Sequence, residues 1–325
     1  MVRDFQHYCK ERMPRLDEAF RKELSLILGD AAMKGHGALE VLMQGGKMIR
    51  GCLLCLITEA LGGRLISALP RAVAVELIHG ATLIHDDFVD QDRVRRNRPA
   101  IWTLEGARRA VLLGDIIFAT TIKRMNDLSR EDGIVVSRAI AQVSKGAFQE
   151  PLDPLELAKE VRSGRVHERL YEKIIRLKTG ILFGAACEWG AMAAARVNEG
   201  WVHKWSRYGL LIGEAYQIAD DMKEVRGHLS SRSIRADQMA LLAPAFLYFA
   251  KGAEPYVLSI LESDAAELEP PLRDFFQSMA ARMEEAIEGR LNRAVSELKG
   301  GLPRSEYGTL VMRAPWDLIQ MFHES

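Results

Sequence analysis

Helical periodicity is the feature of this 325-residue sequence that most constrains its fold. Apolar residues recur at helical spacing almost throughout, as at Leu16, Phe20 and Leu24, and the alternation typical of strands is nearly absent. The predicted helices cover residues 48–61, 70–91, 102–126, 132–149, 154–162, 167–195, 199–225, 236–250, 254–263, 268–299 and 304–322. Several are hydrophobic over much of their circumference, which predicts an all-α bundle of many helices around a deep core.

Breaks in the sequence are too scattered to divide the chain. No linker, repeat or low-complexity run is present, so we expect one domain over residues 1–325. Pro70 is expected in the first turn of its helix, where the missing N–H costs nothing.

Cys52 and Cys55 form a C-x-x-C within an apolar stretch and have no second ligand pair, which predicts buried thiols rather than a zinc or redox site.

Charge is balanced, with 44 basic and 44 acidic residues. This balance argues against a nucleic-acid-binding protein with a general basic field. No uncharged apolar run reaches the length of a membrane span, about 20 residues, because the longest one contains Glu188. The N-terminus also lacks the apolar core of a signal peptide. These features predict a protein that works outside the membrane.

A cluster of acidic residues ends the predicted helix 70–91. Asp86 and Asp90 are four residues apart and share one helix face, and Asp87 lies one step around the helix. The preceding apolar residues indicate that this helix is largely buried, so the carboxylates repel one another unless cations lie between them. Aspartate oxygens without His or Cys favour hard Mg²⁺, which also binds phosphates.

A second acidic cluster repeats this spacing. Asp220, Asp221 and Glu224 follow the apolar stretch from Leu210 to Ala219. One such cluster is compatible with a solvated helix end, but two with equal spacing, each ending an apolar helix, favour a common role. If the two helices pack side by side, the six carboxylates can face each other across a cavity and hold several Mg²⁺ ions around one diphosphate.

Basic residues lie close to the acidic clusters in the sequence. Arg95 and Arg96 directly follow the first cluster, where arginine suits bidentate contact with phosphate. Lys47 and Arg50 follow a pair of glycines at a predicted helix start, and His79 lies two helical turns before Asp86. Each of these features alone is more typical of a solvated loop, a helix start or a core histidine.

Together these motifs resemble the trans-prenyl diphosphate synthase family, with its two aspartate-rich motifs. The resemblance spans nearly the whole chain and keeps the family order. It is carried by G-G-K-M-I-R at 45–50, the segment A-V-E-L-I-H-G-A-T-L-I-H-D-D-F-V-D-Q-D-R-V-R-R at 74–96, Gly114-Asp115, Lys178-Thr179, Y-Q-I-A-D-D at 216–221 and L-P-R-S-E-Y at 302–307.

The resemblance implies a homodimeric helical bundle of the isoprenoid synthase type with a central cavity. It implies that an allylic diphosphate is gripped by Mg²⁺, about three ions per site, on Asp86, Asp87, Asp90 and Asp220. The same diphosphate would be contacted by Arg95, Lys178, Thr179 and Gln217. The diphosphate of isopentenyl diphosphate would be bound by Lys47, Arg50, His79 and Arg96.

The implied reaction needs no covalent nucleophile. The allylic C–O bond ionises, the double bond of isopentenyl diphosphate attacks the cation, and a proton is lost to the released pyrophosphate. Asp86, Asp87, Asp90, Lys178 and Asp220 are the expected catalytic residues, since they position the leaving group and counter its charge. We expect a cytoplasmic enzyme with peripheral membrane contact at most, where its apolar product is released.

Three departures from the family pattern leave alternatives open. Met48 and Gly51 stand where Arg and Pro are usual, and Glu224 stands for a third aspartate. The stretch after Glu224 lacks two family lysines, for which Arg232 or Arg235 are the nearby replacements. A weakly active regulatory subunit of a heteromeric synthase and a terpene-cyclase-like enzyme therefore remain as hypotheses. A ferritin-like di-iron site is a third, because Glu76 and His79 fit a Glu-x-x-His pair.

Product length is predicted from the residues before Asp86. Thr82 and Ala81 precede it by four and five positions, so they lie just over one helical turn below the metal site. Large aromatic residues at these positions block elongation in relatives. The small side chain of Ala81 therefore predicts a product longer than C15.

Overall fold

The computed structural model describes residues 3–29, 46–150, 153–165, 169–194, 197–229, 231–263 and 265–323, and Gly45 of the first basic motif lies outside them. The described part is helical apart from two short hairpins, which confirms the all-α prediction. Its helices are α1 (Phe5–Leu28), α3 (Ile49–Ala60), α4 (Leu65–Val89), α5 (Ile101–Glu105), α6 (Ala107–Leu128), α7 (Arg130–Phe148), α8 (Pro154–Arg162), α9 (Arg169–Ile175), the π-helix η2 (Arg176–Gly180), α10 (Ile181–Ala193), α11 (Glu199–Leu229), α12 (Ala236–Phe249), α13 (Glu254–Leu261), α14 (Pro270–Glu297) and α15 (Glu306–His323). Its strands are β1 (Val94–Arg95), β2 (Arg98–Pro99), β3 (Ser233–Arg235) and β4 (Ala265–Glu267).

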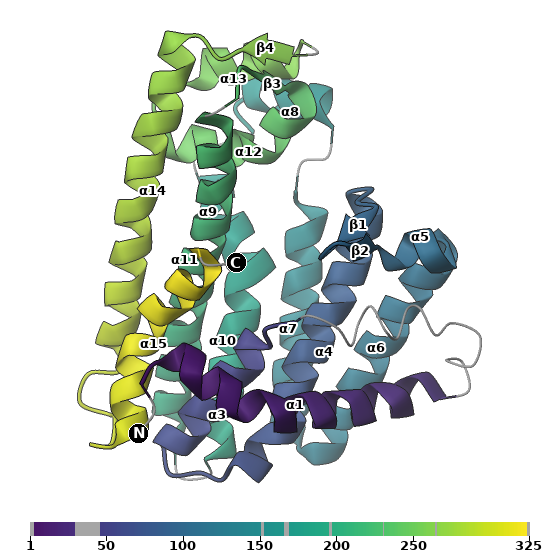
Figure 1. Ribbon diagram of the computed structural model, residues 1–325, viewed down its shortest axis with the longest axis vertical. Helices are drawn as coiled ribbons and strands as arrows, with labels where there is room; N and C mark the ends of the chain where they lie inside the picture. Colours follow the sequence, from purple (N-terminus) through teal and green to yellow (C-terminus); the bar gives the residue numbers. More distant parts are fainter. Residues whose placement is uncertain are drawn as a thin grey trace.

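The long helices form a bundle (Figure 1). Helices α11 and α14 run side by side at one side, and α10 packs between α11 and α3. Helices α4, α6 and α7 make the other side, and α1 crosses the base of α4. The hairpin β3–β4 and helices α8, α12 and α13 lie at the far end of α11 and α14. Because α4 and α11 stand in different halves of the bundle, their ends can face one another across a space.

Two apolar clusters form the core. The larger one is built around α3, α4 and α10 and includes Leu53, Leu54 and Trp189, all fully buried. The second lies between α11, α12 and α14 and includes Ile218 and Phe246. All four cysteines are buried and free, so the prediction of buried thiols at Cys52 and Cys55 is confirmed. Of the helices in the described ranges, none is long and apolar enough to cross a membrane.

Two predictions about helix α4 and the segment 167–195 were wrong in detail. Helix α4 begins at Leu65, so Pro70 lies inside the helix rather than in its first turn. The extra turn before Pro70 is stable because Ala68 is fully buried. This packing offsets the loss of the backbone hydrogen bond that proline cannot donate. The predicted helix 167–195 is interrupted by the π-helix η2, which carries Lys178 and Thr179.

The segment 92–106 also differs from the prediction. Strands β1 and β2 pair as an antiparallel hairpin whose turn residues, Arg96 and Asn97, both have positive φ (51° and 62°). Such a turn matches the twist of two short strands. The predicted helix 102–126 is divided at Gly106, whose φ of 85° favours a residue without Cβ. Neither the hairpin nor the break at Gly106 produces an apolar periodicity, so the sequence did not indicate them.

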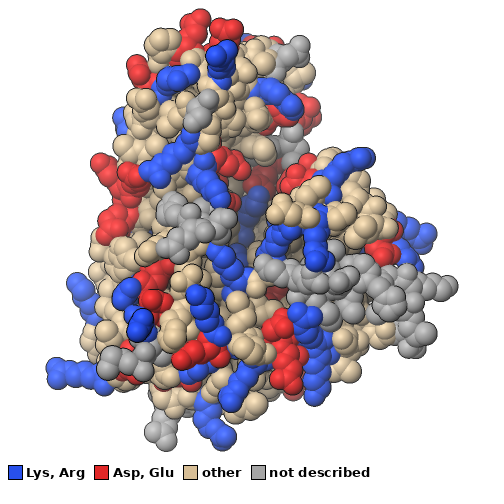
Figure 2. All heavy atoms as spheres, viewed as in Figure 1, with Lys and Arg blue, Asp and Glu red and all other residues tan. Residues whose placement is uncertain are grey.

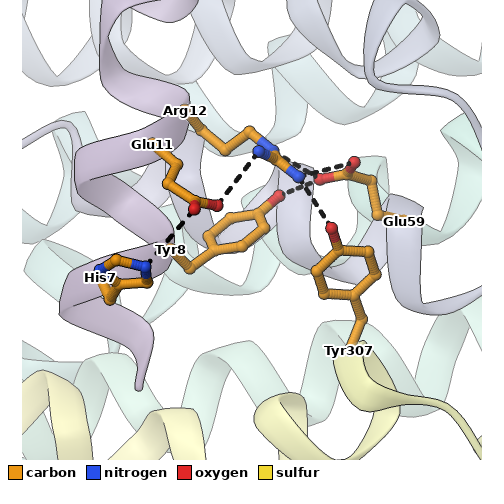
Figure 3. Close-up of polar contacts among 6 residues, drawn as sticks. All are labelled: His7, Tyr8, Glu11, Arg12, Glu59 and Tyr307. Atoms are coloured by element: carbon orange, nitrogen blue, oxygen red, sulfur yellow. Dashed lines mark hydrogen bonds and ion pairs between the residues drawn. The ribbon is translucent and has the colours of Figure 1, made fainter. Parts of the chain in front are cut away.

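A cluster of polar contacts around Arg12 ties α1 to α3 and α15 (Figure 3). The Arg12 guanidinium donates to both carboxylate oxygens of Glu59, at 3.0 and 3.3 Å, and to the Tyr307 hydroxyl at 2.8 Å. The Tyr8 hydroxyl donates to the same Glu59 carboxylate at 2.5 Å. The side chains of Arg12 and Glu59 are only 19% and 16% exposed, so the pair is shielded from solvent.

Replacing Arg12 by alanine should destabilise the protein, because Glu59 would keep its charge in a shielded position without a cationic partner. Removing one member of such a pair costs about 3 kcal/mol. Chemical denaturation would measure the free energy of unfolding. The matched control is Lys123→Ala, which breaks an exposed i,i+4 pair with Asp127 and should cost about 0.5 kcal/mol or less. Equal losses in the two variants would contradict this role of the Arg12 cluster.

Candidate active site

The first acidic cluster occupies the last turn of α4. Asp86 and Asp87 are in the helix, and Asp90 is its C-cap residue with φ −80°. Burial, with a smaller contribution from the carboxylates of Glu150 and Asp90, raises the pKa of Asp86 to about 6 although Lys178 acts to lower it. The C-terminal end of a helix dipole also disfavours negative charge. Local structure alone therefore destabilises these carboxylates, as expected of groups that serve a bound cation.

The second acidic cluster lies near the end of α11. Asp221 is half-buried and accepts hydrogen bonds from the Tyr171 hydroxyl at 2.5 Å and from the Gln217 amide at 2.9 Å. Burial raises the pKa of Asp221 to about 7. The side chains of Asp220 and Glu224 are exposed and, among the described residues, take no hydrogen bond or ion pair.

Lys178 connects the two clusters. Its ammonium acts electrostatically on Asp86 and Asp90 of the first cluster and on Asp220 and Glu224 of the second. A small cavity of about 60 Å³ is lined by Asp90 from the first cluster, Asp221 from the second, and Lys178 and Gln217. The two acidic helix ends therefore face one cavity. Figure 2 shows acidic and basic side chains lining the hollow between the two sides of the bundle.

Lys178 is held by a carboxylate that the sequence analysis did not single out. Its ammonium donates to both oxygens of Glu150, at 2.7 and 2.9 Å, just beyond the end of α7. Burial alone would lower the pKa of Lys178, but Glu150, Asp86 and Asp90 raise it. Within the described ranges, no three His, Cys, Asp or Glu side chains lie close enough to hold one metal ion, and Lys178 supplies the positive charge between the clusters.

The π-helix η2 places Lys178 in the lining of the cavity, and the next residue, Thr179, is buried. The Thr179 hydroxyl lies 2.5 Å from the side-chain oxygen of Gln217 on α11. Glycines permit this close packing, because a Cβ on Gly213 would lie 2.7 Å from the Cα of Gly180. Single π-turns are frequently found at functional sites, where they turn side chains out of the regular helical register.

The arginine-bearing hairpin is anchored to the first cluster. Arg95 forms an ion pair with Asp87, and Asp87 is itself buried. The positive φ of Arg96 lets the chain turn directly after this contact. The pair therefore fixes where the loop after α4 lies. Arg235, considered as a replacement for a missing lysine, instead donates to Asp237 at the start of α12.

A larger cavity of about 450 Å³ adjoins the first cluster. It lies between α4, α1 and the β1–β2 hairpin and is lined by the predicted residues His79, Asp87, Arg95 and Arg96, with Phe20 on the α1 side. Burial and the neighbouring arginines lower the pKa of His79, so its imidazole is neutral near pH 7. Of the arginines on this lining, Arg96 and Arg98 make no ion pair with another described residue, so they are available to an anionic ligand.

Arg50 and Lys47, both predicted to bind an anion, make contacts with the protein instead of lining the larger cavity. The Arg50 guanidinium lies 4.6 Å from the centre of the Phe183 ring, and its buried Nε has no hydrogen-bond partner among the described residues. Such an orphaned donor is costly unless a ligand satisfies it. Lys47 donates to the backbone carbonyl of Met321 at 2.7 Å, which directs its ammonium toward the C-terminal helix rather than to the cavity.

Glu76, which with His79 fits a Glu-x-x-His pair, contacts the backbone of a neighbouring helix. Its carboxylate accepts a hydrogen bond from the backbone N–H of Gly51 at 2.7 Å, and burial raises its pKa. The Gly51 that departs from the family pattern has a clear packing reason here. A Cβ at this position would lie 2.7 Å from Leu16 and 3.3 Å from the backbone of Ala72.

Glu150 and Tyr171 are the site residues that sequence reasoning missed. Both are far from the acidic clusters in the chain and belong to no charged motif. Tyr171 reaches Asp221 because α9 packs against α11, and Glu150 reaches Lys178 because α7 packs against η2. Only the tertiary packing creates these contacts, so neither spacing nor composition signals them.

Comparisons with known proteins agree with this fold and site. The polyprenyl synthetase family profile matches residues 36–232. A geranylgeranyl diphosphate synthase from Methanosarcina mazei is 31% identical over 81% of this chain and 82% of its own length. Component 2 of a heptaprenyl diphosphate synthase from Geobacillus stearothermophilus is 30% identical over 84% of this chain and 85% of its own.

The fold is also that of solved isoprenyl diphosphate synthases. A geranylgeranyl pyrophosphate synthetase from Pyrococcus horikoshii superposes with a TM-score of 0.75, covering 96% of this chain and 98% of the other, at 23% identity. The architecture is therefore the all-α fold of the isoprenyl diphosphate synthases. The chain belongs to the polyprenyl synthetase family. This membership confirms the prediction of a prenyltransferase and removes the di-iron alternative.

The contact between Gly213 and Gly180 gives a test of how η2 is positioned. Gly213→Ala should lower stability by about 1–3 kcal/mol, since its Cβ would overlap Gly180 and Phe183 at 2.7 and 2.9 Å. Displacement of η2 should also lower activity. Gly227→Ala on the same helix is the control, because nothing lies within 4 Å of its added Cβ, and it should be neutral or stabilising. Thermal unfolding of both variants decides, and a neutral Gly213→Ala would contradict the tight packing of η2.

Proposed function

We propose that this protein is a Mg²⁺-dependent trans-prenyl diphosphate synthase that joins an allylic diphosphate head to tail to isopentenyl diphosphate. One observation carries the proposal. Asp90 and Asp221, from two acidic helix ends, line the same cavity with Lys178, and an arginine-lined cavity adjoins it. Such an arrangement would offer carboxylates to a metal-bound diphosphate and arginines to a second diphosphate. The relatives named as geranylgeranyl and farnesyl diphosphate synthases support it.

The donor set fits magnesium. The candidate ligands are oxygen atoms only, which suits a hard cation that keeps several waters and bridges to phosphate. The residues that would hold it are Asp86, Asp87, Asp90, Asp220, Asp221 and Glu224. Asp87 and Asp221 already have partners, so the four others have the most accessible oxygens. When bound, Mg²⁺ would neutralise negative charge on the departing diphosphate.

Basic and polar side chains of the chain would complete the allylic diphosphate site. Lys178, Thr179 and Gln217 are on adjacent elements beside the first cavity, and Arg95 is held there by Asp87. Lys178 has to exchange part of its contact with Glu150 for phosphate oxygens. Its positive charge would then act where negative charge develops as the C–O bond ionises.

Isopentenyl diphosphate would occupy the larger cavity. Arg96, His79 and the orphaned Nε of Arg50 are the groups that would receive its diphosphate, with Lys47 farther away. Its double bond attacks the allylic cation, and the proton lost from the adduct passes to pyrophosphate. Apolar walls, including Phe20 and Ile84, exclude the water that would quench the cation.

The apolar interior below Asp86 supports a product longer than C15. Ala81 is fully buried on α4 and Ile78 is fully buried one turn further down. A small side chain at position 81 would let a growing tail pass where an aromatic ring would block it. The relatives named as geranylgeranyl and heptaprenyl diphosphate synthases support this length range.

We further infer one catalytic domain over residues 1–325 that works as a homodimer in the cytoplasm. The apolar side chains of Val111, Leu112 and Ile116 on α6 are 36–49% exposed, which supports a covered surface there.

A second candidate function is a subunit of a heteromeric synthase, favoured by the Geobacillus stearothermophilus relative named as component 2. Turnover by the purified chain alone would exclude dependence on another subunit. Release of a hydrocarbon or alcohol without isopentenyl diphosphate would instead indicate a terpene cyclase.

The two acidic clusters can be tested directly. Asp86→Asn and Asp220→Asn should each lower turnover at least about 100-fold, because each removes an anionic ligand from the site. Product formation from labelled isopentenyl diphosphate and defined allylic primers would be measured with Mg²⁺ and with a chelator. Asp127→Asn, on the exposed face of α6, should retain wild-type turnover. Full activity in the chelator, or of either cluster variant, would refute the proposed role of the aspartates.

The predicted product length has its own test. Ala81→Phe should shorten the product, since an aromatic ring would fill the space just over one turn below Asp86. Mass spectrometry of the extracted products would give the length distribution. Ala81→Ser keeps a small side chain and should leave this distribution unchanged. An unaltered distribution in Ala81→Phe would contradict the position of the tail, and a wild-type product of C15 or less would contradict the length.

A further inference from the structure

A hydrogen-bonded chain links three elements behind the candidate diphosphate site. Tyr171 of α9 donates its hydroxyl to one oxygen of Asp221 at 2.5 Å, and the side-chain amide of Gln217 donates to the other at 2.9 Å. The carbonyl oxygen of Gln217 accepts from the Thr179 hydroxyl at 2.5 Å. Elements that are separate in sequence, α9, η2 and α11, are thereby joined through side chains alone.

The direction of these hydrogen bonds is determined by chemistry. When Asp221 is ionised its carboxylate can only accept, so the Gln217 amide then turns its NH₂ group to Asp221 and its oxygen to Thr179. If Asp221 lost its orientation, Gln217 could rotate and release Thr179. Tyr171 is the one member of this chain that comes from outside the motif residues, and it donates to the Asp221 oxygen that Gln217 does not contact.

The surroundings of Tyr171 make it a rigid anchor. Its side chain is only 3% exposed, and its ring packs edge-on against Phe249 with the centroids 5.4 Å apart. A tilted contact to Tyr248 at 5.5 Å holds the ring from α12 as well. The hydroxyl therefore has little freedom to move away from Asp221. Tyr171 also lines the small cavity together with Asp90 and Lys178.

We propose that Tyr171 is a positioning residue for the allylic diphosphate site, which acts by orienting Asp221 and, through it, Gln217 and Thr179. This inference rests on the proposed function and deepens it, because it assigns a role to a residue outside the two acidic motifs. Preorganised donors bind a diphosphate without first rearranging. A misplaced Gln217 or Thr179 would weaken the contacts to the allylic substrate. The arginine-lined cavity, which Tyr171 does not line, would be unaffected.

The test is Tyr171→Phe, which removes the hydroxyl and keeps the ring that packs against Phe249. We expect kcat/KM for the allylic diphosphate to fall about 10-fold or more, mainly through KM. The KM for isopentenyl diphosphate should stay within about twofold of wild type. A purely structural role would not separate the two substrates, since loss of folded protein lowers turnover for both.

A neighbouring tyrosine provides the matched control. Tyr248 contacts the same ring, but its hydroxyl donates to the exposed Glu172 at 2.9 Å instead of to the site. Tyr248→Phe should therefore keep both KM values. The double variant Tyr171→Phe with Asp221→Asn should lose no more than Asp221→Asn alone, because residues that act in one chain are not additive.

Binding of Mg²⁺–pyrophosphate, measured by calorimetry, separates the inference from the proposed function. Wild-type protein should bind, and Tyr171→Phe should bind about 10-fold more weakly. Equal binding and equal allylic KM in Tyr171→Phe and Tyr248→Phe would overturn the inference. If Tyr171→Phe binds Mg²⁺–pyrophosphate more weakly but wild-type protein turns over no primer, the positioning role stands and the proposed reaction is wrong.

Discussion

Repulsion between carboxylates gathered from two helix ends is the constraint on which the rest of this structure depends. Asp86 and Asp90 end α4, and Asp220 and Glu224 lie near the end of α11, yet both pairs experience the charge of one lysine, Lys178. Burial and helix polarity both oppose negative charge at the end of α4. These buried carboxylates lower the stability of the folded protein, as expected of groups that are arranged for a function.

The surrounding elements are organised to hold Lys178 at that point. The π-helix η2 lies against α11 through the contact of Gly180 with Gly213, and against α7 where Gly146 meets Leu177. Glu150 then orients the ammonium from the side of α7. Small residues at helix contacts thus place a charged side chain, and the apolar core supplies the rigidity that keeps it there.

In the proposed reaction, each of the two cavities would bind one of the two diphosphates. Around the smaller one, acidic groups and Lys178 would meet a diphosphate through bound cations. Around the larger one, Arg96 and Arg98 make no ion pair with another described residue and would meet a diphosphate directly. Asp87 joins the two, because it belongs to the first acidic cluster and also anchors Arg95. Of the two departures from the family pattern in this region, Met48 lines the larger cavity, whereas Gly51 packs against Leu16 and Ala72.

Apolar periodicity and the repeated carboxylate spacing determined the all-α fold and the two acidic clusters, because both patterns act over one or two helical turns. The roles of the basic and polar residues around the clusters came from the resemblance of the motifs to a known family. Tertiary structure decided what depends on contacts between distant segments. It placed Glu150 on Lys178, Tyr171 on Asp221 and Lys47 on a C-terminal carbonyl. It also interrupted the segment 167–195 at η2 and carried α4 past Pro70. Periodicity cannot anticipate these features, since each is stabilised by packing against a helix remote in the chain.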